Sequence, residues 1–119
     1  MLFMAGMFMF AVGFFPCDAG CVDVTWIGKM HSFTSTIPSI TLPLAAIFLA
    51  NVFTKKWGRK WGHISFWLGV LSMTAGPMMF LPSSEAYLGL IQRIGIGFSL
   101  IWMFVISVKM LAFYKQNEK

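Results

Sequence analysis

The feature that most constrains the fold is a long apolar run, Leu88 to Phe113, which contains two charged residues, Arg93 and Lys109. A helix rises about 1.5 Å per residue, so this run is longer than the roughly 30 Å hydrocarbon core of a bilayer. We therefore expect it to form a transmembrane helix. A charge that faces lipid near the bilayer centre costs at least about 2.5–3.5 kcal/mol, so we expect Arg93 to face protein or trapped water. An intramembrane arginine is the first candidate for a functional residue.

The composition of the whole chain is typical of a membrane protein. The 119 residues are 58% hydrophobic and 11% charged, whereas soluble domains have about 25% charged residues. The net charge is +5, but the basic residues stand at the ends of apolar blocks, so we expect no nucleic-acid partner. We predict a single all-α domain over residues 1–119, a polytopic transmembrane bundle of four helices. The expected spans are about 1–15, 32–53, 61–81 and 86–113.

The distribution of charges predicts how these four spans are oriented. One set of span ends carries most of the basic residues, and the opposite set carries acids. The basic set is Lys55, Lys56, Arg59, Lys60, Lys115 and Lys119, and the acidic set is Asp18, Asp23 and Glu85. Cytoplasmic loops carry an excess of Lys and Arg. We therefore expect both termini to be cytoplasmic, in a multi-pass protein of a bacterial or archaeal cytoplasmic membrane.

A polar cluster is expected at the outer face. On the last helix Glu85, Gly89 and Arg93 are spaced by four residues and share one face. On the second helix His31 and Ser35 form a similar stripe. If the two stripes face each other, they line a polar pocket that opens outward. The candidate ligand-binding residues are Arg93, His31, Asp18, Asp23, Glu85 and Ser35. A structural ion pair that locks helix ends together is the open alternative.

The cysteines and histidines do not form a convincing metal or redox site. Cys17 and Cys21 have CxxxC spacing, and a simple disulfide or an incidental pair is favoured over redox chemistry or metal ligation. His31 and His63 are expected at opposite ends of their helices, roughly 30 Å apart, so they cannot share one ion. We expect no metal and no cofactor.

A stripe of small residues runs along the third helix. Its members are Ser65, Gly69, Ser72 and Gly76. Small residues let membrane helices approach each other closely. We expect ordinary packing within the bundle. A homo-oligomer interface is the alternative.

The chain resembles the prokaryotic integral-membrane family catalogued as domain of unknown function 998. The resemblance rests on Gly13-Phe14-Phe15-Pro16 followed by Asp18, on His31 at the start of the next span, and on Gly89-Leu90-Ile91-Gln92-Arg93-Ile94 in the last. It implies about six spans, of which this chain would lack the first two, so missing helices are a further candidate partner. It also implies functional positions at Asp18, His31 and Arg93. Gln92 stands where Glu is common in such sequences.

The sequence suggests three functional hypotheses. The favoured one is a non-enzymatic or functionally unassigned membrane protein whose outer pocket binds an anionic lipid or small amphiphile through Arg93, because a guanidinium fork suits phosphate or carboxylate. The alternative is a membrane-embedded lipid hydrolase or transferase that uses Asp18 and His31 as acid and base. A proton-coupled exporter is disfavoured because every acid lies at a helix end or beyond it.

Overall fold

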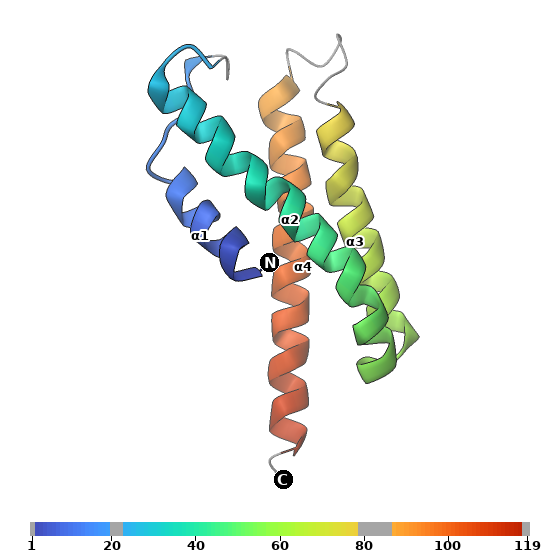
Figure 1. Cartoon of the computed structure of the whole chain (residues 1–119). Coiled ribbons are helices and arrows are strands. Elements are labelled where there is room, and N and C mark those ends of the chain that lie inside the picture. The colour runs from blue at the N-terminus through green and yellow to red at the C-terminus, as the bar shows by residue number, and fades with distance from the viewer. Residues whose placement is uncertain (1, 20–22, 79–86, 118–119) are drawn as a thin grey trace.

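The computed structural model describes residues 2–19, 23–78 and 87–117. The secondary structure of these ranges is helical, as the sequence predicts (Figure 1). The four helices are α1 (Leu2–Val12), α2 (Trp26–Trp57), α3 (Arg59–Met78) and α4 (Leu88–Asn117). The prediction of an all-α chain with four helices is confirmed. The Cα atoms occupy 55 × 29 × 17 Å, so the bundle is long and thin.

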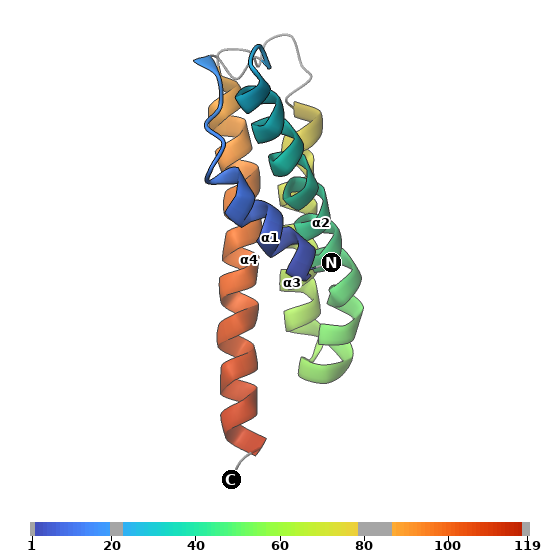
Figure 2. The same cartoon turned by 60° about the vertical axis from the view of Figure 1, so that its left-hand side comes forward.

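Two of the helices, α2 and α4, are long and apolar enough to cross a membrane. Helix α1 has 11 residues, which corresponds to about 16 Å, or roughly half of a hydrocarbon core. The start of α1 lies about midway along α4 in both views (Figures 1 and 2). The predicted span at about 1–15 therefore corresponds to a half-length helix, and its place in a membrane stays a prediction.

Helix α2 begins six residues before the predicted span at 32–53. Thr25 caps its N-terminus by accepting a hydrogen bond from the backbone N–H of Gly28 at 3.1 Å, which satisfies a donor that the first helical turn leaves free. The helix continues through Pro38 and Pro43, which are both fully buried. Sequence polarity placed residues 26–31 outside the span, whereas the cap makes them the first turns of the helix.

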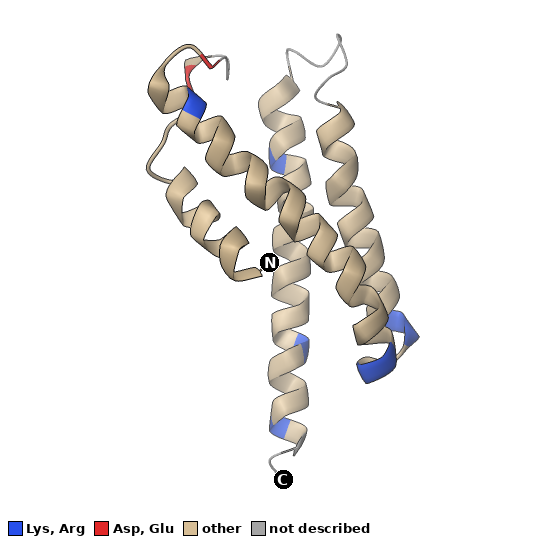
Figure 3. Ribbon diagram, in the orientation of Figure 1, with Lys and Arg blue, Asp and Glu red and all other residues tan. Residues whose placement is uncertain are grey.

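Gly58 alone separates α2 from α3. Its φ of 95° lies in the left-handed region, which side chains rarely adopt. Its backbone N–H donates to the Thr54 carbonyl at 3.0 Å. This turn brings the basic residues on either side of it together at one end of the molecule, which we call the basic end (Figure 3). The acidic end is the opposite end, with Asp18 and Asp23.

Small residues allow α3 to approach α2 closely. A Cβ built on Gly69 would lie 2.9 Å from the Pro43 carbonyl oxygen and 2.8 Å from Ile47 Cγ1. At Gly76 a Cβ would meet nothing within 4 Å. The predicted small-residue stripe is therefore packing within the bundle over its first part, whereas Gly76 is exposed.

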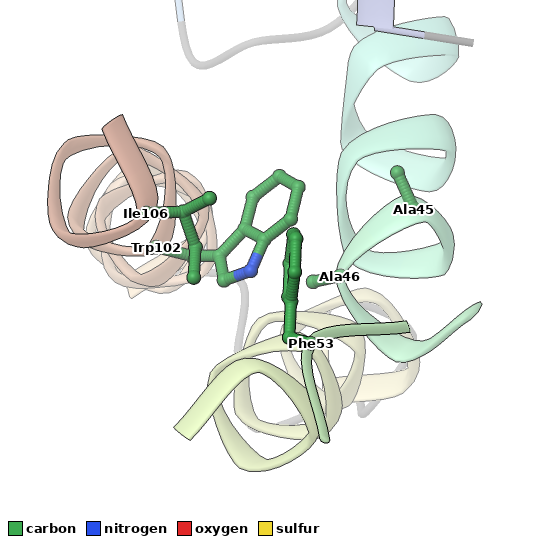
Figure 4. Packing of buried hydrophobic residues seen from close by; sticks show 5 residues of the cluster. All are labelled: Ala45, Ala46, Phe53, Trp102 and Ile106. Carbon is green, nitrogen blue, oxygen red and sulfur yellow. The ribbon is translucent and has the colours of Figure 1, made fainter. Parts of the chain in front are cut away.

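A tryptophan from α4 fills the space between the helices in the half nearer the basic end. Trp102 is 2% exposed, and Figure 4 shows its ring beside Phe53 of α2, with Ala46 close by. The indole N–H of Trp102 donates to Ser65 Oγ at 2.7 Å, and that hydroxyl donates to the Ala46 carbonyl at 2.7 Å. One buried serine on α3 thus links α2, α3 and α4.

Candidate functional site

The carboxylate of Asp18 holds the N-terminus of α2. Its Oδ2 accepts hydrogen bonds from the backbone N–H groups of Val24 at 3.0 Å and Thr25 at 2.7 Å. Its Oδ1 accepts from the Thr25 hydroxyl at 2.7 Å. A Cβ at Gly28 would collide with this carboxylate, since it would lie 2.6 Å from Asp18 Cγ. Asp18 is therefore a capping residue for the helix that carries His31.

These hydrogen bonds change the acidity of Asp18. The backbone N–H of Thr25, followed by its hydroxyl and by the backbone N–H of Val24, lowers the pKa of Asp18 from its ordinary value of 3.8, and desolvation opposes this shift only partly. A carboxylate that accepts several hydrogen bonds is stabilised in its charged form. Asp18 is consequently ionised at neutral pH and acts as an acceptor at the helix N-terminus, where negative charge is favourable.

Two further hydrogen bonds fix the segment before α2 to the helix. His31 Nδ1 lies 2.6 Å from the carbonyl oxygen of Phe15. The Ser32 hydroxyl donates to Asp23 Oδ1 at 2.5 Å. Asp18 and His31 each bond to other groups, and no hydrogen bond joins them among the described residues. The arrangement orients the His31 ring relative to the end of α1.

A cavity of about 260 Å³ lies beneath this segment at the acidic end. It is bounded by α1, the segment after it, α2 and α4. Its lining residues are Met9, Val12, Cys17, His31, Ser35, Gly89, Gln92, Arg93 and Ile96. The residues that α1 contributes are apolar, whereas α2 contributes the imidazole of His31 and α4 contributes the guanidinium of Arg93 and the amide of Gln92. This is the combination expected of a site that takes a small polar group attached to an apolar one.

Arg93 is the charged residue among those that line the cavity. It is exposed, and it lies in the second turn of α4, about 7–8 Å along the axis from Leu88. Its Nη1 is 3.7 Å from the position of a Cβ on Gly89, one turn nearer the helix start. The side chain thus extends toward the acidic end, as long basic side chains do near a membrane interface. Within the described ranges Arg93 forms no ion pair and no hydrogen bond.

The cavity brings together three of the six predicted ligand-binding residues. Arg93, His31 and Ser35 line it, so the two expected stripes on the second and last helices do face each other. Asp18 and Asp23 do not line it, because they bond to residues at the start of α2. Glu85 lies outside the described residues. Whether any of the six binds a ligand stays a prediction.

Sequence reasoning missed Gln92 and the α1 wall of the cavity. From the sequence alone, Gln92 is notable only for standing where Glu is common, although the amide of Gln92 carries both donors and an acceptor. Met9 and Val12 belong to an apolar block with no polar pattern, so nothing in the sequence marks them as lining residues. Their position depends on how α1 packs against α2, which only the folded chain provides.

Cys17 also lines the cavity, and it is disulfide-bonded. The sequence has one other cysteine, Cys21, which lies outside the described residues. A disulfide is one of the two outcomes that the CxxxC spacing favoured. No cluster of three or more His, Cys, Asp or Glu that could hold a metal ion occurs within residues 2–19, 23–78 and 87–117.

The fold and the cavity define the class of protein: an all-helical chain with two helices able to cross a membrane and, near one end, a cavity lined by both apolar and polar residues. A family model described as "Protein of unknown function (DUF998)" matches residues 1–109. The chain therefore belongs to this family, and the resemblance carried by the proline, histidine and arginine motifs is confirmed. No curated protein and no solved structure matches the chain.

Proposed function

We propose that this chain is a multi-pass membrane protein that binds an anionic phospholipid in the cavity at its acidic end. In this proposal the acidic end faces outward, the basic end and both termini are cytoplasmic, and the membrane is that of a bacterium or archaeon. The observation that carries the proposal is an arginine without an ionic partner in the described chain, on the wall of a cavity that also has an apolar side.

Arg93 supplies the recognition of the anion. Removing a charge from water is costly unless a counter-charge compensates it. The described acids at this end of the molecule are Asp18 and Asp23, and they already accept hydrogen bonds from Thr25 and Ser32, respectively. Two oxygens of a phosphate group would each accept one of two parallel hydrogen bonds from the guanidinium fork. The phosphate would also lie close to the N-terminal turns of α4, where the helix dipole favours negative charge.

The size of the cavity limits which part of the ligand enters. Cavities for drug-sized molecules are about 300–1,000 Å³, so a volume of about 260 Å³ suits a headgroup rather than a whole lipid. The acyl chains would then lie against exposed apolar residues outside the cavity. Such residues are abundant on α1 and on the first half of α4, for example Phe10, Leu90 and Ile94.

The rival hypothesis of a lipid hydrolase or transferase gains no support from the arrangement of its two residues. A general base must be within hydrogen-bond reach of its proton donor or its orienting group. Asp18 accepts from Val24 and Thr25, and His31 is bonded to the carbonyl of Phe15. In the lipid-binding proposal Asp18 has a structural role, and His31 is one of the residues that line the binding cavity.

Native mass spectrometry of the protein in a mild detergent tests the proposal. Wild type, Arg93→Gln and Arg93→Lys are compared after incubation with phosphatidylglycerol and with phosphatidylcholine. We expect wild type to retain phosphatidylglycerol, Arg93→Gln to lose it, and Arg93→Lys to retain less, because lysine lacks the bidentate fork. Equal retention by wild type and Arg93→Gln, with equal thermal stability, would overturn the proposal.

A further inference from the structure

The hydrogen bond between His31 and Phe15 fixes which ring nitrogen carries the proton. A carbonyl oxygen can only accept, and His31 Nδ1 lies 2.6 Å from it, so Nδ1 is the donor. In the neutral ring the other nitrogen, Nε2, is then an acceptor with a lone pair. Protonation adds a hydrogen at Nε2 and turns that atom into a charged donor. Protonation therefore changes the hydrogen-bonding role of His31 at one known atom, Nε2.

Because Nδ1 is used in the hydrogen bond to Phe15, Nε2 is the ring nitrogen of His31 that is left to interact with a ligand in the cavity. His31 is one of the lining residues, on the wall formed by α2, and Arg93 lines the same cavity from α4. No described residue forms a hydrogen bond with Nε2. An anion bound by Arg93 would meet a lone pair if His31 were neutral, and a second positively charged donor if it were protonated.

We propose that anion binding in this cavity is coupled to the uptake of one proton at His31 Nε2. The inference rests on the proposed function and adds its regulation. No bond other than that N–H is made or broken, and the proton comes from water. Coupling is reciprocal, so an anion that favours the protonated ring must bind more tightly when the ring is protonated. Protonation of histidine side chains is commonly observed between pH 5 and 8, so the coupling is tested by comparing binding at the two ends of that range.

The other titratable and charged groups near His31 are few. The described residues of α1 contain no titratable side chain. In the segment before α2, the carboxylates of Asp18 and Asp23 are bonded to Thr25 and Ser32. The remaining described groups at this end are Cys17, which does not titrate because it is disulfide-bonded, Lys29 on α2, Tyr87 just before α4 and Arg93 on α4.

Phosphatidylglycerol binding at two pH values tests the coupling. Its phosphodiester keeps a single negative charge throughout, so a change in affinity reports on the protein. We expect wild type to bind at least about five-fold more tightly near pH 5.5 than near pH 8, at the lower end of the usual range of coupling between two sites. The water-soluble headgroup, glycerophosphoglycerol, should bind more weakly with the same pH dependence. Tighter binding of the headgroup than of the lipid would make a soluble phosphodiester the occupant.

Two substitutions separate the two nitrogens of His31. In His31→Asn the side-chain amide takes the place of Nδ1 and still donates to Phe15, but Nε2 is missing. In His31→Gln the amide reaches toward the position of Nε2 and cannot take up a proton. We expect both variants to bind phosphatidylglycerol with no pH dependence, and His31→Asn to keep the thermal stability of wild type. If one variant fails to fold, the other still provides the test.

The outcomes distinguish this inference from the proposed function. Binding that requires Arg93 but is equal at both pH values would overturn the coupling and leave the lipid site intact. A pH dependence that persists in His31→Asn would also overturn it, because the proton would then enter elsewhere. Binding that Arg93→Gln does not weaken at either pH would overturn the proposed function itself.

Discussion

At the scale of single residues, hydrogen bonding decides which of the predicted site residues are free to act. Asp18 is the clearest case. The sequence places it beside Arg93 as a candidate partner, but its two carboxylate oxygens accept three hydrogen bonds from Val24 and Thr25. Arg93, by contrast, lies along its own helix over Gly89. The predicted polar cluster thus contains one residue that caps a helix, Asp18, and one that lines the cavity, Arg93.

Gly28→Ala should weaken the cap. The added methyl group would collide with the Asp18 carboxylate, and loss of a helix cap costs about 0.5–2 kcal/mol. We expect a lower melting temperature in detergent and weaker protection of the backbone amides at the start of α2 in hydrogen exchange. The matched control is Gly97→Ala on α4, where a Cβ meets nothing within 4 Å. Equal stability of the two variants would contradict the capping role.

The lowered pKa of Asp18 predicts a specific loss of stability in acid. The native state binds this proton less tightly than the unfolded chain does, so the stabilisation is complete above the ordinary value of 3.8 and disappears as the pH falls through the lower native pKa. We expect wild type to lose thermal stability below about pH 4, and Asp18→Asn to be less stable at neutral pH and less sensitive to acid. The control is Asp23→Asn, which should keep the acid sensitivity. Parallel curves for wild type and Asp18→Asn would contradict this prediction.

At the scale of helices, hydroxyl groups and small residues on α3 join it to both neighbours. Ser65 connects Trp102 of α4 to the backbone of α2, and Ser72 donates to the Gly95 carbonyl of α4 at 2.6 Å while it shares a hydrogen bond with Ser99. Lipid tails provide little hydrophobic driving force between helices, so close packing and such hydrogen bonds carry the association.

Ser65→Ala should destabilise the bundle more than the removal of a single hydroxyl group would suggest. The substitution leaves the buried indole N–H of Trp102 and the Ala46 carbonyl without their bridge. We expect a loss of roughly 1–2 kcal/mol in unfolding measured by denaturing detergent titration, near the upper end for hydrogen bonds between membrane helices. Ser107→Ala, at an exposed position on α4, is the control and should be neutral. A Ser65→Ala variant as stable as that control would exclude the bridge.

The helices were largely predictable from sequence, whereas their boundaries and the site were less so. Apolar blocks and the basic turn at Gly58 identify the helices, because hydropathy depends on local composition. Helix α2 begins six residues before the predicted span at 32–53, and its cap depends on a hydrogen bond between Asp18 and Thr25, which are seven residues apart in the sequence. Helical spacing predicted that His31 and Ser35 share one face of their helix and that Gly89 and Arg93 share one face of theirs, whereas the facing of the two stripes was only a condition of the predicted pocket. The α1 wall with Met9 was not, since it depends on tertiary packing.

At the scale of the whole molecule, the charges are distributed asymmetrically along the bundle. Figure 3 shows lysine and arginine clustered at the turn between α2 and α3, while the described acids lie at the far end of α2. The positive-inside rule predicts that the basic end is cytoplasmic. In that orientation the proposed lipid-binding cavity would lie in the outer half of the membrane, and a proton taken up by His31 would come from the outer side.

Reporter fusions at the C-terminus test this orientation. A green fluorescent protein fused after Lys119 should be fluorescent, and an alkaline phosphatase fused there should be inactive, because the first matures in the cytoplasm and the second requires the oxidising exterior. As a control, the same reporters fused after Met78 should give the reverse result, since this end of α3 lies at the acidic end. An active phosphatase at the C-terminus would reverse the predicted topology.

The most direct measurement for the central claim is photo-crosslinking with a phosphatidylglycerol that carries a photoreactive group on its headgroup, followed by peptide mapping. Binding in the cavity predicts crosslinks to the segments that form its walls, around Met9, His31 and Arg93, with strong reduction by Arg93→Gln and by excess unlabelled phosphatidylglycerol. Crosslinks concentrated at the basic end, around Lys55 and Lys60, and unchanged by Arg93→Gln would contradict a lipid site in the cavity.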